Sequence, residues 1–183
     1  MRVIAGTAKG TKLAPVPAGV RPVSDRVREG VFSSVAPDVT GSRVLDLFAG
    51  TGAMGIEALS RGAEHVTFVD SARASIALIR SNLERTRLAT RADIVRADVL
   101  AFLTGSGKTV QRVGLVFLDP PYEYGPRELE PVVEAIASGW LDPRGATVVL
   151  TRGRQSSMPV IPVDWPSARR LSYGDSLVVL YRP

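Results

Sequence analysis

The feature that most constrains the fold is an alternation of short apolar runs with helical segments, which begins at residue 43. The apolar runs predict strands at Arg43–Phe48, Val66–Asp70, Asp93–Arg96, Val113–Leu118 and Ala146–Thr151. Helices are predicted between them at Met54–Arg61, 72–86 and Glu128–Ser138. Because strands that alternate with helices are joined by crossovers, they form a parallel sheet covered on both faces. We therefore expect an α/β protein with a doubly wound sheet.

The last part of the chain predicts antiparallel pairing. Ala168–Tyr173 and Leu177–Arg182 are strand-like runs on either side of Gly174-Asp175-Ser176, a sequence typical of a tight turn. This hairpin would bring the sheet to seven strands, most of them parallel. A length of 183 residues is enough for one such domain with a proper core.

The first part of the chain predicts a small extension in front of the sheet. Arg2–Ala5 and Thr11–Ala14 flank a Gly/Lys turn and predict a β-hairpin. Ser24 is the expected N-cap of a helix that contains Asp25–Glu29. We assign residues 1–36 to this extension and residues 37–183 to the main domain.

Positive charge is concentrated in the extension. The chain carries a net charge of +5, and residues 1–30 hold six basic side chains against two acidic ones. A basic arm on a nearly neutral body is typical of a protein that binds a polyanion such as a nucleic acid. The predicted nucleic-acid contacts in the arm are Arg2, Lys9, Lys12, Arg21, Arg26 and Arg28.

Two residue counts exclude several kinds of chemistry. The chain has no cysteine and a single histidine, His65. A disulfide, a thiolate metal site and a cysteine nucleophile are therefore excluded, and we expect no metal site. The start, Met1–Gly6, has no apolar segment, and no stretch is long enough to span a bilayer. We therefore expect a cytoplasmic protein that has no membrane partner.

A glycine-rich loop follows the first predicted strand. Gly50, Gly52 and Gly55 satisfy the G-x-G-x-x-G pattern of nucleoside-cofactor sites, and Asp70 lies about 20 residues further on. The glycines let a ligand approach the backbone closely, and an acid at the end of the second strand can accept both ribose hydroxyls. The pattern alone fits a nicotinamide cofactor as well as S-adenosylmethionine. A helix cap is the alternative role of Asp70.

Acidic residues at the strand ends favour S-adenosylmethionine. Asp46 lies inside the first strand, where a carboxylate attracts the cationic methionine end and repels a pyrophosphate. Asp98 is placed to accept a hydrogen bond from the adenine amine, and Asp119 ends the fourth strand. The carboxyl ends of parallel strands share one edge of the sheet, so these acids would surround one pocket. The predicted cofactor contacts are Asp46, Phe48, Ala49, Gly50, Thr51, Gly52, Asp70, Ser71, Asp98 and Val99.

The segment Asp119-Pro120-Pro121-Tyr122 matches the [DNS]-P-P-[YFW] signature of enzymes that methylate exocyclic amines of bases. Its two prolines have a fixed φ and no N–H, so the turn is stiff. The Asp119 carboxylate and the Pro120 carbonyl would accept hydrogen bonds from the amine and aim its lone pair at the methyl group. Orientation and charge stabilisation would then supply most of the catalysis. Tyr122 would stack on an extruded base.

Together these segments resemble the bacterial 16S ribosomal RNA guanine-N2 methyltransferases, the RsmD-like family. The resemblance covers nearly the whole chain, and its matching segments are Arg2–Gly6, Arg21-Pro22, Asp25–Glu29, Val44–Gly52, Gly55–Gly62 and Phe117–Tyr122. It implies a Rossmann-like class I methyltransferase fold with S-adenosylmethionine as the methyl donor. It also implies methylation of one guanine near the ribosomal P site, within a partly assembled 30S subunit. We expect the protein to act as a monomer.

The chain departs from the family at three places. Ser33 stands where many relatives have Asn, Gly30 where Ala is common, and Thr151-Arg152 where an acid often ends the fifth strand. Arg152 and Arg154 belong to the loop after that strand, on the edge where the acids gather. We predict that both contact RNA phosphate, with ordinary solvation as the alternative.

Two other functions stay open at this stage. An adenine-N6 methyltransferase would share the catalytic turn, although the short chain has no obvious domain for reading a DNA sequence. A non-catalytic RNA-binding assembly factor would not need the turn to be intact. The extension could likewise be an RNA-docking arm or a structural flap. If it docks RNA, RNA binding should fall steeply as the salt concentration rises. Truncation of residues 1–20 should then weaken RNA binding and spare cofactor affinity.

Overall fold

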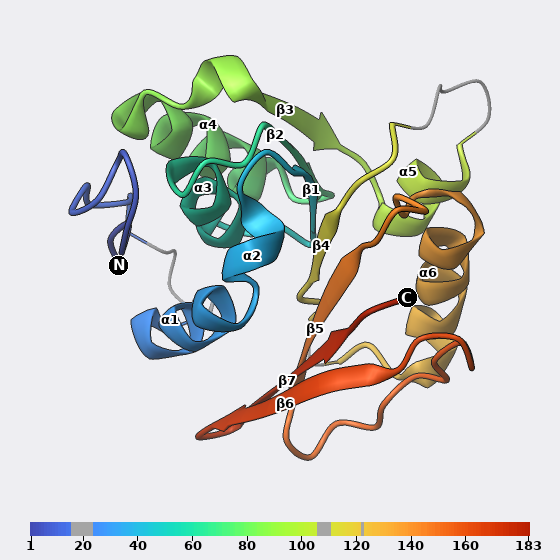
Figure 1. Ribbon diagram of the computed structural model, residues 1–183. Helices are drawn as coiled ribbons and strands as arrows, with labels where there is room; N and C mark the ends of the chain where they lie inside the picture. The colour runs from blue at the N-terminus through green and yellow to red at the C-terminus, as the bar shows by residue number, and fades with distance from the viewer. Residues whose placement is uncertain (16–23, 106–110, 122) are drawn as a thin grey trace.

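The structure, a computed structural model, describes residues 1–15, 24–105, 111–121 and 123–183. Within them lies a seven-stranded sheet of order β3-β2-β1-β4-β5-β7-β6 (Figure 1). The strands are β1 (Arg43–Leu47), β2 (His65–Asp70), β3 (Ala92–Arg96), β4 (Leu115–Leu118), β5 (Thr147–Gly153), β6 (Ser167–Tyr173) and β7 (Ser176–Tyr181). The helices are α1 (Asp25–Ser34), α2 (Ala36–Val39), α3 (Ala53–Ser60), α4 (Arg73–Thr86), α5 (Val99–Thr104) and α6 (Pro126–Gly139), with a 3-10 turn, η1, at Ala89–Arg91.

Strands β1 to β5 are parallel, and β7 pairs antiparallel with both β5 and β6. The prediction of a mostly parallel sheet completed by a C-terminal hairpin is therefore confirmed. The order changes direction between β1 and β4, which are neighbours with Leu47 opposite Leu118. This is the switch point at which open α/β sheets form a crevice beyond the carboxyl ends of their strands.

Every strand and helix predicted from residue 43 onward is present, with ends that shift by at most two residues. The predicted α1 is also confirmed, and the Ser24 Oγ accepts a hydrogen bond from the Val27 N–H at 3.3 Å. Two short helices, α2 and α5, were not predicted. The two predicted N-terminal strands do not form as strands, although the chain does turn back as the predicted hairpin requires. One antiparallel bridge joins Arg2 and Lys12, and the Val3 and Leu13 N–H groups donate to the Thr11 and Met1 carbonyls.

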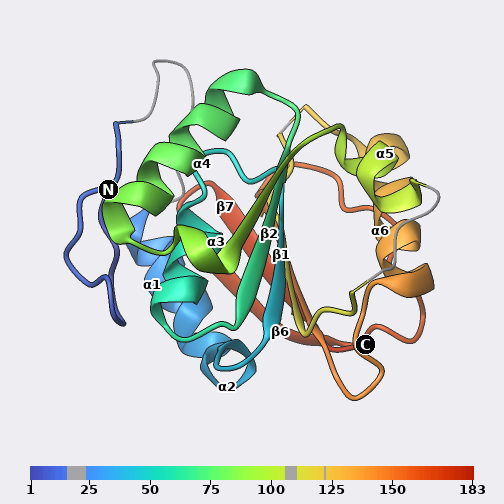
Figure 2. The same ribbon diagram turned by 90° about the horizontal axis from the view of Figure 1, so that it is seen from above.

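Helices cover both faces of the sheet (Figure 2). On one face α1, α3 and α4 contribute to a cluster of buried apolar side chains, and on the other face α5 and α6 contribute to a second cluster. Trp140 and Trp165 are buried in the second cluster.

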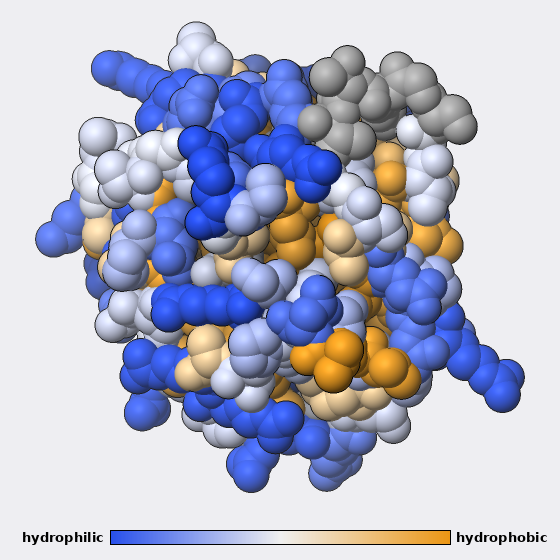
Figure 3. Space-filling model, turned by 45° about the vertical axis from the view of Figure 1, so that its right-hand side comes forward, coloured by the Kyte–Doolittle hydropathy of each residue, from blue (hydrophilic) through white to orange (hydrophobic). Residues whose placement is uncertain are grey.

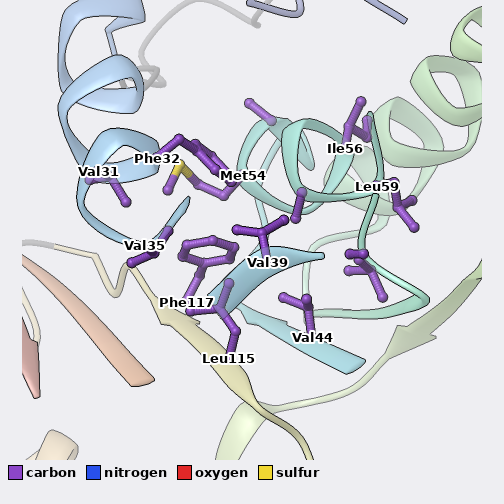
Figure 4. Close-up of a cluster of buried hydrophobic side chains, with 14 of the residues drawn as sticks. Val31, Phe32, Val35, Val39, Val44, Met54, Ile56, Leu59, Leu115 and Phe117 are labelled. Carbon is purple, nitrogen blue, oxygen red and sulfur yellow. The ribbon is translucent and has the colours of Figure 1, made fainter. Parts of the chain in front are cut away.

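Helix α1 packs into the main core rather than beside it. Figure 4 shows Val31 and Phe32 of α1 facing Met54 of α3 and Phe117 of β4. The rings of Phe32 and Phe117 are 5.6 Å apart between centroids, a distance typical of aromatic packing. Residues of the extension and of the main domain therefore share one hydrophobic cluster.

The first fourteen residues are fastened to α3 by hydrogen bonds. The Ile4 and Ala5 N–H groups donate to the two carboxylate oxygens of Glu57, at 2.8 and 2.9 Å. The Ala8 N–H donates to the Ser60 Oγ at 3.0 Å. Gly6 lies so close that a Cβ atom there would be 1.8 Å from the Ser60 carbonyl oxygen. The extension is thus tied to the helix that follows the glycine-rich loop.

The outer surface is mostly polar on the face shown in Figure 3, with apolar side chains gathered in a few small areas. Val160 and Val163 are exposed large apolar side chains. In the described part of the chain, no helix combines the length and the apolar character that crossing a membrane requires.

Candidate active site

The glycine-rich loop joins the end of β1 to the start of α3. Gly50 and Gly52 have positive φ angles of 56° and 75°, which glycine adopts readily, and Gly52 is the N-cap of α3. Phe48 also has a positive φ, 57°, which is a strained conformation for a residue with a side chain. Among the described residues, a Cβ atom on Gly50 would meet only the Phe48 carbonyl oxygen, at 3.9 Å. The backbone at Gly50 therefore has open space beside it, where a ligand can lie close.

The interior side of the loop is held by polar contacts. Ala49 and Gly50 are half-buried, whereas Thr51 is buried and its carbonyl accepts a hydrogen bond from the Asn82 Nδ2 at 2.9 Å. Asp46 is also buried, and its Oδ2 accepts the Gly55 N–H at 2.9 Å. Asp46 thus accepts a backbone hydrogen bond from the first turn of α3. Its predicted attraction to a cationic ligand stays a prediction.

The electrostatic environment of Asp46 is strongly perturbed. Burial raises the pKa of its carboxyl well above the usual range, the hydrogen bond from Gly55 lowers it, and the charges of Asp119 and Asp70 raise it again. Three of the strand-end acids therefore lie close enough to influence one another, as the shared edge of the sheet predicts. Together they make this edge attractive to a cation.

Asp70, at the end of β2, connects two loops of the edge. Its Oδ2 accepts the Gly50 N–H and its Oδ1 accepts the Ala72 N–H, both at 2.8 Å. A carboxylate has about four lone-pair sites, so a site on each oxygen remains for a ribose hydroxyl. Asp70 can therefore accept these backbone N–H groups and bind the ribose of a cofactor at the same time. Ser71, the next residue, is exposed at the same edge.

Asp98 caps α5, because its Oδ1 accepts the Ala101 N–H at 2.9 Å. The residue is exposed, whereas the neighbouring Val99 is buried in the second core cluster. The capping bond explains why α5 begins at Val99. Contact of either residue with an adenine stays a prediction.

Asp119 lies directly beyond β4, next to the end of β1. Its N–H points at the Leu47 carbonyl at a distance of 3.5 Å, and its side chain is half-buried. Burial raises the pKa of the Asp119 carboxyl from 3.8 to about 7, and the positive charge of Arg152 opposes this rise. Pro120 is buried and Pro121 exposed, whereas Tyr122 lies outside the described residues. A carboxylate that titrates near neutral pH at such an edge is a candidate catalytic group.

The predicted RNA contacts divide into exposed and buried side chains. Arg2, Lys9, Lys12, Arg26 and Arg154 are exposed, so they can reach a phosphate backbone. Arg21 lies outside the described residues. Arg28 and Arg152 are 0% and 1% exposed, and their prediction as phosphate contacts is corrected by this burial. Sequence alone does not distinguish a buried arginine from a solvated one in a basic segment.

Both buried arginines serve the interior. Arg28 donates to the Arg2 carbonyl at 2.7 Å and to the Asp25 carboxylate at 2.6 Å, and it lies 3.5 Å from Glu57. Arg152 donates to backbone carbonyls of the segments that follow β4 and β5. A buried charge needs such partners to offset the loss of hydration.

Tyr124 is a residue of the site that the sequence did not point to. Its ring contacts the ring of Phe48 edge-on, with 5.4 Å between the centroids. The contact joins the segment after Asp119 to the glycine-rich loop. The only indication of this role in the sequence is that an aromatic residue stands two positions after the Asp119–Tyr122 signature. Nothing in the sequence indicates that its ring contacts Phe48.

Comparisons with known proteins agree with this geometry. The family model Conserved hypothetical protein 95 matches residues 1–182. The chain is 36% identical over 183 residues to YlbH of Bacillus subtilis, covering 100% of this chain and 98% of that protein. It is 35% identical over 185 residues to Ribosomal RNA small subunit methyltransferase D of Escherichia coli, covering 100% of this chain and 89% of the relative.

A solved structure matches the fold over the whole chain. The Escherichia coli protein yhhF has a TM-score of 0.86 and 33% sequence identity, with 100% of this chain and 97% of the other covered. The expected Rossmann-like class I methyltransferase fold is thereby confirmed. Because the family model spans residues 1–182 and the relatives match over the full length, the chain belongs to the RsmD-like methyltransferase family, whose model is described as Conserved hypothetical protein 95.

Proposed function

We propose that this protein transfers the methyl group of S-adenosylmethionine to the exocyclic N2 amine of a guanine in 16S ribosomal RNA. The observation that carries the proposal is the position of Asp119 and Pro120 beside the glycine-rich loop, where β1 and β4 end side by side. An amine held by Asp119 and Pro120 would face a ligand above that loop. The Escherichia coli relative, named for methylation of small-subunit ribosomal RNA, supports RNA as the substrate.

The residues of the loop fit S-adenosylmethionine. Asp70 keeps acceptor sites for ribose hydroxyls, Gly50 leaves room for a ligand, and Asp46 and Asp119 favour a cation at this edge. Bound S-adenosylmethionine would supply an electrophilic methyl group on its sulfonium sulfur. Contacts to the adenine are assigned to Asp98 and Val99, and those to the methionine end to Asp46.

Asp119 orients the nucleophile. The guanine N2 amine is conjugated with its ring and is a weak nucleophile, so hydrogen bonds that direct its lone pair are valuable. Its two N–H groups would donate to the Asp119 carboxylate and to the Pro120 carbonyl. The lone pair would form the new N–C bond as the S–C bond breaks. The Asp119 carboxylate would stabilise the positive charge that develops on nitrogen and would then accept the surplus proton.

The RNA would lie across the edge that carries these groups. Exposed cations of the extension, with Arg154, would contact phosphates, and Tyr122 would stack on the extruded base. The extension, residues 1–36, acts in this proposal as the docking part and residues 37–183 as the catalytic part. The substrate is a partly assembled 30S subunit in the cytoplasm, and the enzyme acts as a monomer.

The test is transfer of a labelled methyl group to small-subunit particles that lack the modification, followed by nucleoside analysis. N2-methylguanine is the expected product. N6-methyladenine would replace the proposal with the adenine alternative, and the absence of any product would favour a non-catalytic assembly factor.

A matched pair of variants assigns the chemistry. Asp119→Ala should bind the cofactor nearly as well as the wild type and transfer little methyl group. Asp142→Ala removes a partly buried aspartate whose partner is the exposed Arg144, and it should leave transfer unchanged. Wild-type turnover by Asp119→Ala would remove Asp119 from the mechanism.

A further inference from the structure

We propose that Arg152 is a positioning residue for methyl transfer: its guanidinium holds the segment after Asp119 by its backbone carbonyls, and its positive charge acts on the Asp119 carboxylate. The inference rests on the proposed function, because it assigns a role in the same reaction. Arg152 lies near the end of β5, the strand next to β4 in the sheet. It therefore approaches the catalytic turn from the strand that flanks it.

The side chain of Arg152 is buried among backbone oxygens. Its Nη1 donates to the Pro121 carbonyl at 3.4 Å, and its Nη2 donates to the carbonyls of Tyr124 and Ser157, the latter at 3.4 Å. Arg152 is only 1% exposed, so these bonds form away from solvent. Because guanidinium donors are fixed in one plane, carbonyls that bind them are held in fixed relative positions.

Two of these carbonyls belong to the segment that carries the chemistry. Pro121 is part of the proline turn, and Tyr124 lies just beyond it. The Tyr124 ring in turn contacts Phe48, the strained residue of the glycine-rich loop. One guanidinium thus links β5 to the catalytic turn and, through Tyr124, to the loop that would hold the cofactor. A small displacement of the catalytic turn relative to the glycine-rich loop would lower the rate of methyl transfer, because in-line transfer needs aligned reacting atoms.

The charge of Arg152 also acts on Asp119. Among the described residues, Arg152 of β5 is the charged group that shifts the pKa of this carboxyl, whereas Asp119 itself raises the pKa of Asp46 on β1, the strand on the other side of β4. Burial favours the protonated acid, and the guanidinium favours the carboxylate. A carboxylate accepts hydrogen bonds from an amine better than a neutral acid does. Arg152 thereby increases the fraction of protein that can orient the substrate at neutral pH.

Two substitutions separate the geometric effect from the charge effect. Arg152→Met keeps much of the volume but removes both the charge and the donors. Arg152→Lys keeps the charge but replaces the planar fork by a single ammonium group. Arg144→Met, at an arginine whose side chain is 88% exposed and which pairs with Asp142, is the control for loss of one positive charge.

The first readout needs neither cofactor nor RNA. The titration of the Asp119 carboxyl carbon is followed by NMR in the full-length protein, with Asp119→Asn used to assign the signal. In Arg152→Met the midpoint should rise by about one pH unit or more, whereas in Arg152→Lys and Arg144→Met it should stay near that of the wild type. An unchanged midpoint in Arg152→Met would overturn the charge effect, even if the protein proved to methylate no RNA.

The second readout is methyl transfer by the same proteins. Both Arg152 variants should lose about tenfold or more in kcat with little change in the cofactor Kd, because misplacement of the turn weakens orientation and not cofactor binding. The pH–rate inflection should move upward only in Arg152→Met. Wild-type kcat in Arg152→Lys would overturn the positioning role, and this variant still decides the question if Arg152→Met does not fold. Failure of wild-type protein to modify RNA would instead count against the proposed function.

Discussion

Glu57 and Arg28 form an ion pair in which both side chains are fully buried, with 3.5 Å between the glutamate Oε2 and the arginine Nη1. Glu57 belongs to α3, the helix that starts at the glycine-rich loop, and Arg28 belongs to α1 of the extension. The same carboxylate accepts the N–H groups of Ile4 and Ala5. One acid therefore joins both parts of the extension to the helix that begins at the candidate cofactor site.

Replacement of Glu57 by Gln should destabilise the protein strongly. The substitution leaves the buried Arg28 charge without its full compensation, which costs about 3–5 kcal/mol in comparable buried pairs. Urea unfolding measures the effect. The control is Glu64→Gln, because Glu64 is exposed and lies 3.5 Å from Arg43, where the loss should stay below about 1 kcal/mol. Equal losses in the two variants would show that the buried pair is not important for the fold.

Gly6 and Gly10 offer a matched pair for testing how the first residues are attached. Both have a positive φ, 82° and 84°, so an Ala at either position is strained, by about 1–2 kcal/mol. At Gly6 the new Cβ atom meets the Ser60 carbonyl oxygen at 1.8 Å, whereas at Gly10 no neighbour among the described residues lies within 4 Å. Gly6→Ala should therefore cost more stability than Gly10→Ala.

Amide hydrogen exchange locates that difference. The Thr7 N–H donates to the Ser60 carbonyl at 2.8 Å, so its protection reports on the docked extension. Protection of Thr7 should fall in Gly6→Ala and persist in Gly10→Ala. If both variants keep the wild-type exchange rate at Thr7, the extension is not held by this close approach.

The sheet could be predicted because its signals are local. Apolar runs of four to six residues and the glycines between them indicate strands and turns wherever the sheet lies. The N-terminal strands were wrong because such short runs cannot be told from irregular segments, and here the backbone N–H groups of Ile4 and Ala5 bind Glu57 instead of a neighbouring strand. Helix α5 was missed because Asp98 was interpreted only as a ligand contact, although an aspartate is also a common N-cap.

The site could be predicted only in part, because partners distant in sequence decide what a charged residue does. Arg152 and Arg154 looked equivalent, yet one is buried against carbonyls from two loops and the other is exposed. The requirement for glycine at position 30 likewise depends on a residue that is distant in sequence. A Cβ atom there would be 1.6 Å from the Tyr173 Oη, a residue of the distant C-terminal hairpin.

The exposed cations of the extension should control RNA affinity through salt-dependent binding to phosphates. In Lys9→Gln/Lys12→Gln, binding to small-subunit particles should weaken. The slope of log affinity against log salt concentration should fall by about 0.7–0.9 for each phosphate that the variant no longer neutralises. Arg85→Gln is the control, because Arg85 is exposed on α4, outside the proposed RNA surface. Equal salt slopes in wild type and double variant would contradict RNA docking by these lysines.

These point substitutions test RNA docking more specifically than truncation of residues 1–20, which also removes residues of the hydrophobic core. Val3 and Leu13 are 1% and 6% exposed and belong to the main hydrophobic cluster. Removing them would expose apolar core surface and cost stability as well as charge. Cofactor affinity, measured in parallel, should be unaffected by the lysine substitutions. The truncation, expected from the sequence to spare cofactor affinity, should instead reduce it, because α3 loses the residues that are hydrogen-bonded to it.

Asp119 should make the protein less stable as the pH rises. Burial raises the pKa of its carboxyl from 3.8 to about 7, so between these values the folded state keeps a proton that the unfolded state has released. Stability therefore falls from about pH 4 to about pH 7, and the loss is complete above that range. Relative to the wild type, Asp119→Asn should gain about 2–4 kcal/mol between pH 4 and pH 8. Arg152 stays charged over this whole pH range, so replacing Asp119 changes the stability contributed by Arg152 by the same amount at pH 4 and at pH 8. The change of the stability difference with pH, and not its absolute size, therefore tests the titration of Asp119.

The same substitution should separate orientation from titration in the reaction. Asn keeps an oxygen that accepts a hydrogen bond, and the [DNS]-P-P-[YFW] signature admits it, so Asp119→Asn should retain transfer at a rate lowered about ten- to hundredfold. Wild-type single-turnover rates should rise between pH 6 and pH 8 as the carboxylate forms, whereas the rate of the Asn variant should stay flat. Asp46 is the competing group, because burial also raises its pKa and the charge of Asp119 raises it further. A rate that still rises in Asp119→Asn would assign the inflection to Asp46, and the midpoint should then move downward because the neighbouring negative charge is gone.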